Sequence, residues 1–205
     1  MQLIEVKKQF EEIKKNAKCS KYIACFGKTF IDKGSEEYKI SEKIGALIIK
    51  EGFGVLHGGY IGTMEAVSEG ANKGIKDFKR NEFWNIGVPM KLFDKDVKRA
   101  TCLHLETDDI FDRKRVLIEL CDLCVVLPVG GVGTLLEAIE IFHLNQINEK
   151  FGEKIRPIIF FGKIWENLIS EILNKLNLDK QSKGESFITF VNNLKELEEA
   201  INKKW

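Results

Sequence analysis

The sequence predicts an α/β fold of the Rossmann-like, doubly wound kind, with a mainly parallel sheet and helices on both faces. Three observations predict it. Strand-like apolar runs alternate with helical patterns along the chain. The strand runs are apolar at consecutive positions, as in strands that are covered on both faces. No segment rich in Pro, Gly or Ser interrupts the alternation, so we expect a single domain over residues 1–205.

The individual elements follow from local patterns. Leu3, Val6, Phe10 and Ile13 share one face of an amphipathic N-terminal helix. The polar stretch 177–186 is expected to be an exposed connection. The expected strands are 22–26, 53–57, 84–89, 102–106, 123–128, 156–162 and 186–191. The expected helices are 1–15, about 35–50, 63–73, a helix capped by Asp108 or Asp109 and ending at Leu120, 133–148, 165–176 and 192–202.

Composition limits the partners and the location of the protein. The 205 residues carry a formal net charge of +1, so no strong basic field favours nucleic acid or an anionic membrane as a partner. The longest apolar runs, such as Leu123–Val129, are too short to cross a bilayer. The N-terminal segment lacks the continuous apolar core of a signal peptide. We therefore expect a cytoplasmic protein.

The five cysteines do not form a disulfide framework, because their number is odd and their density is low. Cys121 and Cys124 make a CxxC motif, which raises metal or redox chemistry. However, Cys124 belongs to an apolar strand pattern, and no second CxxC or nearby histidine completes a zinc site. The pattern favours two buried cysteines, and we expect no metal site and no cofactor.

Three glycine-containing loops follow predicted strands. They hold Gly27 and Lys28, then Gly58 and Gly59 in "HGGYIGTM", then "GGVGT" at 130–134. In doubly wound sheets, ligands bind where such loops enter helices, and the free amides of a helix start attract anions. We therefore expect phosphate binding at the third loop, whose residues are Gly130, Gly131, Gly133 and Thr134. The alternative is that these glycines only make tight turns between strand and helix.

Two common nucleotide fingerprints are absent. Gly27, Lys28 and Thr29 resemble the end of a P-loop, but Tyr22 stands where that motif requires glycine. Gly131 and Gly133 begin a dinucleotide pattern, but Leu136 replaces its third glycine. The sequence therefore argues against a P-loop NTPase and, less strongly, against a dinucleotide-dependent enzyme.

A glutamate and an arginine are the candidates for chemistry. Glu137 lies three residues after Thr134, so its side chain shares the face of Thr134 and leans back toward the glycine loop. A carboxylate there suits a sugar hydroxyl, a water or a developing positive charge, and the alternative is an ordinary solvated carboxylate at a helix start. Arg113 and Lys114 fall in the first turns of their helix, where the dipole disfavours cations. A bound anion or an ion pair with Glu137 explains Arg113, and surface solubility is the alternative.

These residues carry a resemblance to a known family. "DRK" at 112–114 and "LCDLCVVLPVGGVGTLLE" at 120–137 resemble the paired "ERK" and "PGGxGTxxE" motifs of the LONELY GUY family. "GFGVLHGGYIGTMEAVSEGANKG" and "KIRPIIFFGKIWENLI" are similar to two further segments of the family, so the resemblance covers nearly the whole chain. Its members are cytokinin riboside 5′-monophosphate phosphoribohydrolases that are often mislabelled lysine decarboxylases.

The resemblance implies a function and a set of site residues. It implies that Arg113 and Glu137 are catalytic and that a nucleoside 5′-monophosphate, AMP or an N6-modified AMP above all, is hydrolysed to free base and ribose 5-phosphate. It also implies a homodimer. Val129 is an extra residue between Pro128 and the glycine pair, which leaves the substrate open. The remaining residues expected to bind phosphate or nucleotide are Gly27, Lys28, Gly58, Gly59, Lys114, Gly130, Gly131, Gly133 and Thr134.

Two further functions stay open. Proteins of related fold carry molybdenum cofactor or sense nucleotide-derived ligands, so a non-catalytic carrier is the main alternative. A nucleic-acid module is disfavoured by the near-neutral charge. Among the histidines, His57 ends a strand at a glycine loop and is a candidate for ligand contact, whereas His104 and His143 are expected to be structural or to lie away from Glu137. Phe111 is a candidate for the wall of a base pocket.

Overall fold

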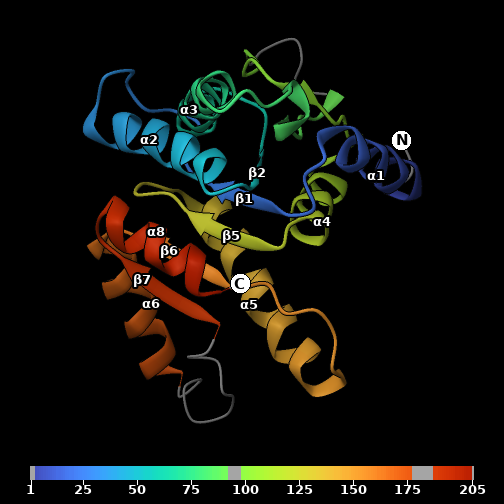
Figure 1. The fold of residues 1–205 in the computed structure, drawn as a ribbon. Helices are drawn as coiled ribbons and strands as arrows, with labels where there is room; N and C mark the ends of the chain where they lie inside the picture. The colour runs from blue at the N-terminus through green and yellow to red at the C-terminus, as the bar shows by residue number, and fades with distance from the viewer. Residues whose placement is uncertain (1–2, 92–97, 177–186, 205) are drawn as a thin grey trace.

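The computed structural model describes residues 3–91, 98–176 and 187–204. Within this part of the chain, seven parallel strands form one sheet in the order β4-β3-β2-β1-β5-β6-β7. The sheet lies between layers of helices, which confirms the predicted fold class (Figure 1). The strands are β1 (Tyr22–Phe26), β2 (Gly54–His57), β3 (Asn85–Gly87), β4 (Leu103–His104), β5 (Leu123–Val126), β6 (Ile158–Phe161) and β7 (Ile188–Val191).

The helices begin and end close to the predicted positions. Ser35 accepts a hydrogen bond from the Tyr38 amide, Asp109 from the amides of Phe111 and Asp112, and Asn193 from the Glu196 amide. These caps fix three helix starts that the sequence indicated. The helices are α1 (Leu3–Ala17), α2 (Glu36–Lys50), α3 (Thr63–Asp77), the 3₁₀ turn η1 (Glu82–Trp84), α4 (Ile110–Leu120), α5 (Val132–Phe151), α6 (Lys163–Lys175) and α8 (Leu194–Lys203).

Three predicted elements had boundaries that were wrong by a few residues, and one prediction cannot be compared. Helix α3 continues four residues beyond the predicted end, and α5 continues to Phe151 because Gly152 supplies the left-handed C-cap. The strand expected at 84–89 is shorter, because residues 82–84 form η1 before it. The connection expected at 177–186 lies outside the described residues.

The core lies on both sides of the sheet. All residues of β1, β2, β5 and β6 are buried, which matches the continuous apolar runs of the sequence. Helices α2 and α3 pack side by side over one face (Figure 1), and Gly45 and Gly70 let their backbones approach closely. None of the described helices combines the length and the apolarity that crossing a membrane requires.

The strand order creates a crevice at one edge of the sheet. From β1 to β4 successive strands are added on one side, and from β5 to β7 on the other, so the order reverses between β1 and β5. Phe26 and Val126 pair at the carboxyl ends of these two strands. A reversal of this kind leaves a space between diverging loops, where open α/β sheets bind their ligands. The loops that hold Gly27 and Gly131 flank this point.

Candidate active site

A small hollow of about 110 Å³ lies at the carboxyl ends of the central strands. It gathers residues from the loops after β1 and β2, from α4 and from the start of α5. The predicted site residues that line it are Gly27, Gly58, Arg113, Gly133, Thr134 and Glu137. The fold therefore brings together side chains and loops that are separated by more than one hundred positions in the sequence.

Arg113 is held in this hollow by backbone carbonyls. Its Nε donates to the carbonyl oxygen of Val88 at 2.9 Å, and its Nη2 donates to that of Gly58 at 3.2 Å. The guanidinium lies over the ring of Tyr60, 5.6 Å from the ring centroid. Burial lowers the pKa of Arg113, and the nearby Glu137 opposes that effect. The contacts fix the guanidinium while its Nη1 side faces Glu137.

Gly58 is required for this position of Arg113. A Cβ atom on Gly58 would collide with Nη2 of Arg113 and with the sulfur of Met64. Glycine is needed here because it lacks a Cβ and so lets the Arg113 side chain approach the backbone closely, and not because of an unusual backbone angle.

Glu137 is the buried acid of the hollow. Only 8% of the residue is exposed, and its Oε1 lies 3.9 Å from Nη1 of Arg113. Burial raises the pKa of Glu137 to about 7, although Arg113 and then Lys114 lower it. Desolvation thus outweighs the attraction of the two cations. A carboxyl group whose pKa lies near neutrality can change protonation state during a reaction at that pH.

The shifted pKa of Glu137 predicts a pH-dependent stability. Because folding raises its pKa from 4.5 to about 7, the folded protein keeps a proton that the unfolded chain has released between these pH values. The stabilising contribution is therefore complete below pH 4.5 and is lost as the pH rises to 7, about 3 kcal/mol in all. Glu137→Gln is expected to gain roughly that amount relative to wild type between pH 4.5 and pH 8, as measured by urea unfolding.

The matched control for this prediction is Glu140→Gln, because Glu140 stands on the same helix with 41% of its side chain exposed. We expect no comparable gain for it. A stability difference between Glu137→Gln and wild type that stays constant with pH would contradict the raised pKa.

The start of α5 presents free amide groups beside Glu137. The first bond within the helix joins the Leu135 amide to the Gly131 carbonyl at 3.0 Å, so the amides of residues 132–134 precede it. Thr134 Oγ1 accepts a hydrogen bond from the Gly131 amide at 3.3 Å, which holds the turn in shape. A Cβ atom on Gly131 or Gly133 would meet no atom within 4 Å. The glycines therefore face open space, as an anion-binding turn requires.

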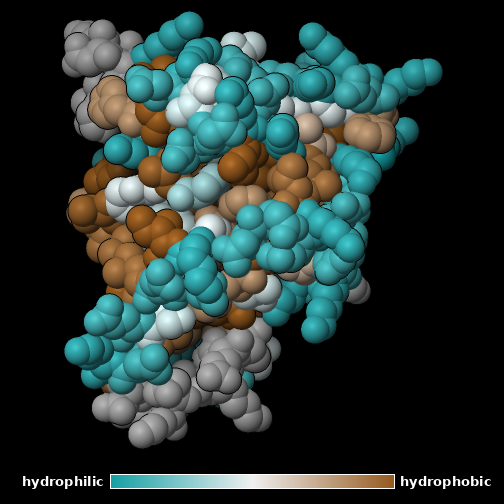
Figure 2. Space-filling model, turned by 90° about the vertical axis from the view of Figure 1, so that its left-hand side faces the viewer, coloured by the Kyte–Doolittle hydropathy of each residue, from teal (hydrophilic) through white to brown (hydrophobic). Residues whose placement is uncertain are grey.

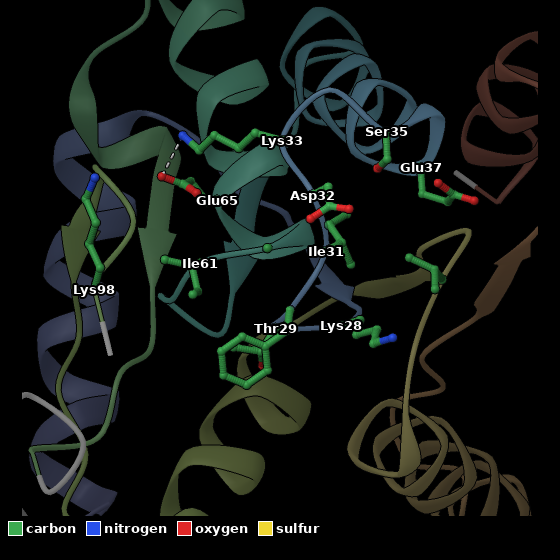
Figure 3. A pocket seen from close by; sticks show the side chains of 13 residues that line it. Lys28, Thr29, Ile31, Asp32, Lys33, Ser35, Glu37, Ile61, Glu65 and Lys98 are labelled. Carbon is green, nitrogen blue, oxygen red and sulfur yellow. Dashed lines mark ion pairs between the residues drawn. The ribbon is translucent and has the colours of Figure 1, made fainter. Parts of the chain in front are cut away.

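A larger hollow of about 690 Å³ adjoins the small one, and Thr29 lines both. Lys28 and the extra residue Val129 are among its lining residues, together with Lys33 and Glu65 (Figure 3). Figure 2 faces the edge toward which the carboxyl ends of the strands point, and hydrophobic side chains gather across its middle. Phe30 is 70% exposed and lines the larger hollow.

Several predicted residues lie away from the small hollow. The Lys114 ammonium pairs with Glu140 at 3.0 Å and contacts the ring of Phe111, which is 73% exposed and lines neither hollow. Gly59 has a φ of 82° and turns the chain against Pro89. Gly130 packs against the side chains of Thr134 and Trp165. These four residues support the site from outside rather than line it.

None of the three histidines lines either hollow. His57 is fully buried, its Nδ1 accepts from the Gly59 amide at 3.1 Å, and its Nε2 faces Asn85 Oδ1 at 3.1 Å. The amide donor identifies Nε2 as the protonated nitrogen. Burial lowers the pKa of His57 to about 4, so the ring braces the glycine loop as a neutral group. His104 faces the Ala100 carbonyl, and His143 is exposed on another face of α5. His57 was a candidate for ligand contact, and both of its ring nitrogens have partners within the protein.

The two cysteines of the CxxC motif lie in the core. Cys121 and Cys124 are buried free thiols, and burial raises the pKa of both, that of Cys121 to about 12. Within the described ranges, no group of three or more His, Cys, Asp or Glu side chains is placed to hold a metal ion.

Sequence reasoning did not single out Glu65 and Lys33. Their side chains form an ion pair of 2.9 Å at the wall of the larger hollow (Figure 3). Glu65 is the third residue of α3, so the only available signal was an acidic residue in the first turn after a glycine loop. Such residues are common at helix starts, and the pairing depends on a loop more than thirty positions away.

Solved structures share this fold. One is a molybdenum cofactor binding protein from the phototrophic bacterium Rippkaea orientalis, with 22% identity, 89% of this chain and 96% of that chain covered, and a TM-score of 0.63. Another is the molybdenum cofactor carrier protein from Chlamydomonas reinhardtii. It has 15% identity and a TM-score of 0.63, and the match covers 90% of this chain and 98% of that chain. A third is DNA processing protein A from Helicobacter pylori. It has 15% identity and a TM-score of 0.56, and the match covers 93% of this chain and 84% of that chain.

At these identities the structural likeness shows the fold alone. No curated protein matches the chain. The family model described as "Possible lysine decarboxylase" matches residues 64–202, more than half of the chain, and includes Arg113, Glu137 and the glycine turn at the start of α5. The chain therefore belongs to the family described as possible lysine decarboxylase, the domain family of the LONELY GUY proteins.

Proposed function

We propose that the protein hydrolyses the N-glycosidic bond of a nucleoside 5′-monophosphate, AMP or an N6-modified AMP above all. The observation that carries the proposal is the buried pair of Arg113 and Glu137 beside the free amides at the start of α5. An acid and a cation that face each other next to an anion-binding turn suit a phosphorylated sugar. Cytokinin release and a homodimer belong to this proposal as expectations from the family.

In the proposed reaction, the bond between C1′ and the base nitrogen breaks, and its electron pair leaves with the base, which takes up a proton. The oxygen of a water molecule then bonds to C1′ and releases one proton, which balances the proton taken up by the base, and the sugar product is ribose 5-phosphate. The transition state resembles an oxocarbenium ion. The Glu137 carboxylate stabilises that charge and orients the water or the ribose hydroxyls, while Arg113 holds Glu137 and the substrate in position.

The 5′-phosphate binds at the turn formed by Gly131, Gly133 and Thr134. Amides 132–134 donate to it, and the positive end of the α5 dipole adds to the attraction. The phosphate does not react, so its binding supplies the energy that positions the sugar against Glu137. Lys114 is not required to reach the phosphate, because it pairs with Glu140.

Gly133→Ala tests the phosphate site. The new methyl group would enter open space at a helical position, so the substitution should preserve stability or raise it slightly. If the phosphate binds there, the methyl group takes its place, and the affinity for ribose 5-phosphate should fall at least about tenfold. Calorimetric titration with ribose 5-phosphate and a thermal melt measure the two effects. Unchanged affinity would place the phosphate elsewhere.

The test of the proposed function is direct. The protein is incubated with AMP, GMP, CMP, UMP and an N6-modified AMP, and free base and ribose 5-phosphate are measured by chromatography. Release of base from one of these substrates by wild type, and its loss in Glu137→Gln, is the expected result. Release by neither protein, or equal release by both, would overturn the proposal.

The second candidate is a non-catalytic carrier of a nucleotide-derived ligand such as molybdenum cofactor. It is favoured by the large open hollow beside the site, by the extra residue Val129 in its wall, and by the two structural neighbours that bind or carry that cofactor. Tight binding of a nucleotide in calorimetry, with no product over hours of incubation, would favour this function over hydrolysis.

A further inference from the structure

The larger hollow provides the room that a nucleotide needs. The small hollow measures about 110 Å³, whereas sites for ligands of this size usually span about 300–1,000 Å³. The neighbouring hollow of about 690 Å³ shares Thr29 with it as a lining residue. Met64 and Glu65, consecutive residues of α3, line the small and the large hollow respectively. A ligand anchored at α5 can therefore extend past Thr29 toward Glu65.

Glu65 is a fixed carboxylate in the wall of this larger hollow. It is 8% exposed, and its Oε1 pairs with the Lys33 ammonium at 2.9 Å (Figure 3). Lys33 also contacts Oε1 of Glu69 at 3.0 Å, and Oε2 of Glu69 accepts from the Tyr38 hydroxyl at 2.8 Å. The network ties the loop after β1 to α3, so the position of Glu65 is set from both sides.

One oxygen of Glu65 remains available. Among the residues that the structure describes, Oε2 of Glu65 has no hydrogen-bond partner. It is also not fully buried, because in this part of the chain Nε of Arg156 is the one side-chain atom that is both fully buried and unpaired. The Oε2 atom therefore keeps access to the hollow. A carboxylate in an ion pair can only accept hydrogen bonds, so it selects a ligand group that carries N–H or O–H.

We propose that the larger hollow binds the base of the nucleotide and that Glu65 accepts a hydrogen bond from the exocyclic amino group of that base. The inference rests on the proposed function only for the placement of ribose and phosphate in the small hollow. A base without the amino group leaves Oε2 of Glu65 without a donor while excluding water from it, and a carbonyl oxygen at the same place is repelled by the carboxylate.

Two matched pairs of nucleotides test the proposal. AMP and purine riboside 5′-monophosphate differ in the 6-amino group, and GMP and IMP differ in the 2-amino group. Wild-type protein is expected to bind the amino-bearing member of one pair at least about tenfold more tightly in calorimetry. The pair that discriminates also tells which edge of the base faces Glu65.

Glu65→Gln should abolish this discrimination. Because Lys33 donates, it attracts the amide oxygen of the new side chain, which turns the NH₂ group toward the hollow. An acceptor is thereby replaced by a donor, and the affinity ratio within the pair should fall to about one or invert. Ribose 5-phosphate lacks a base, so its affinity should stay within about twofold of wild type.

Glu69→Gln is the matched control. Glu69 belongs to the same network but does not line the hollow, so its replacement loosens the loop without removing the acceptor. Discrimination within the pair should persist in this variant. Equal affinities within both pairs for wild type, or an equal loss of discrimination in Glu65→Gln and Glu69→Gln, would overturn the inference.

The binding measurement separates this inference from the proposed reaction. If no base is released but the discrimination depends on Glu65, the base site stands and the hydrolase assignment fails. If base is released without any dependence on Glu65, the reaction stands and the base site is wrong.

Discussion

Glu137→Gln is expected to lower the rate of base release by about 10³-fold. The amide has nearly the same size as the carboxyl group but carries no charge, so it cannot stabilise an oxocarbenium-like transition state. Glu137 lies 3.9 Å from Arg113 in a hollow from which most water is excluded. There the loss of one charge is poorly screened. Single-turnover measurements with AMP at saturating protein would separate this effect from binding.

Glu140→Gln is the control for this substitution. It makes the same chemical change on the same helix, at a carboxylate that pairs with Lys114 outside the small hollow. We expect its rate to remain within about threefold of wild type. The role of Glu137 would be refuted by a Glu137→Gln protein that keeps the wild-type rate, or by equal losses in both variants.

Gly58→Ala is expected to reduce base release by about 100-fold through a displaced Arg113. The added methyl group would occupy the position of Nη2, so the guanidinium must leave the Val88 and Gly58 carbonyls. A displacement of about 1 Å at a positioning group costs roughly this factor. A thermal melt should accompany the assay, since extra volume in a packed site also costs about 1–3 kcal/mol of stability.

A double-mutant cycle distinguishes displacement of Arg113 from general damage. In an Arg113→Ala background the methyl group on residue 58 no longer meets the guanidinium. The remaining contact is with the flexible end of Met64, which can move into the vacated space, so Gly58→Ala should cause little further loss. Fully additive effects of the two substitutions would show that Gly58 acts independently of Arg113.

The order of the strands and helices was predictable because it depends on local patterns. Strands buried on both faces have continuous apolar runs, and Ser35, Asp109 and Asn193 are residue types that cap helices. The boundaries were less predictable where two local signals compete. Trp84 was predicted as the first residue of a strand but ends a 3₁₀ turn, in which it donates its indole N–H to the Ala17 carbonyl.

The candidate site was only partly predictable. Arg113, Glu137 and the glycine turn were found because a resemblance and the helix register pointed to them. The structure places Arg113 and Glu137 in one hollow with Gly133 and Thr134 of that turn. Lys114 and Phe111 were expected to reach the ligand, but they lie one or two positions around α4 from Arg113 and face other partners. The sequence pattern alone did not tell which of these neighbours faces inward.

The sequence by itself determined the fold class, the helix caps and the presence of a glycine turn before a buried acid, because each depends on residues that are close along the chain. The tertiary structure decided the environment of those groups. It buried Glu137 enough to raise its pKa to about 7, and it paired Glu65 with Lys33 across a hollow. The desolvation of Glu137 and the pairing of Glu65 with Lys33 both depend on segments that are distant in the sequence, so only the folded chain determines them.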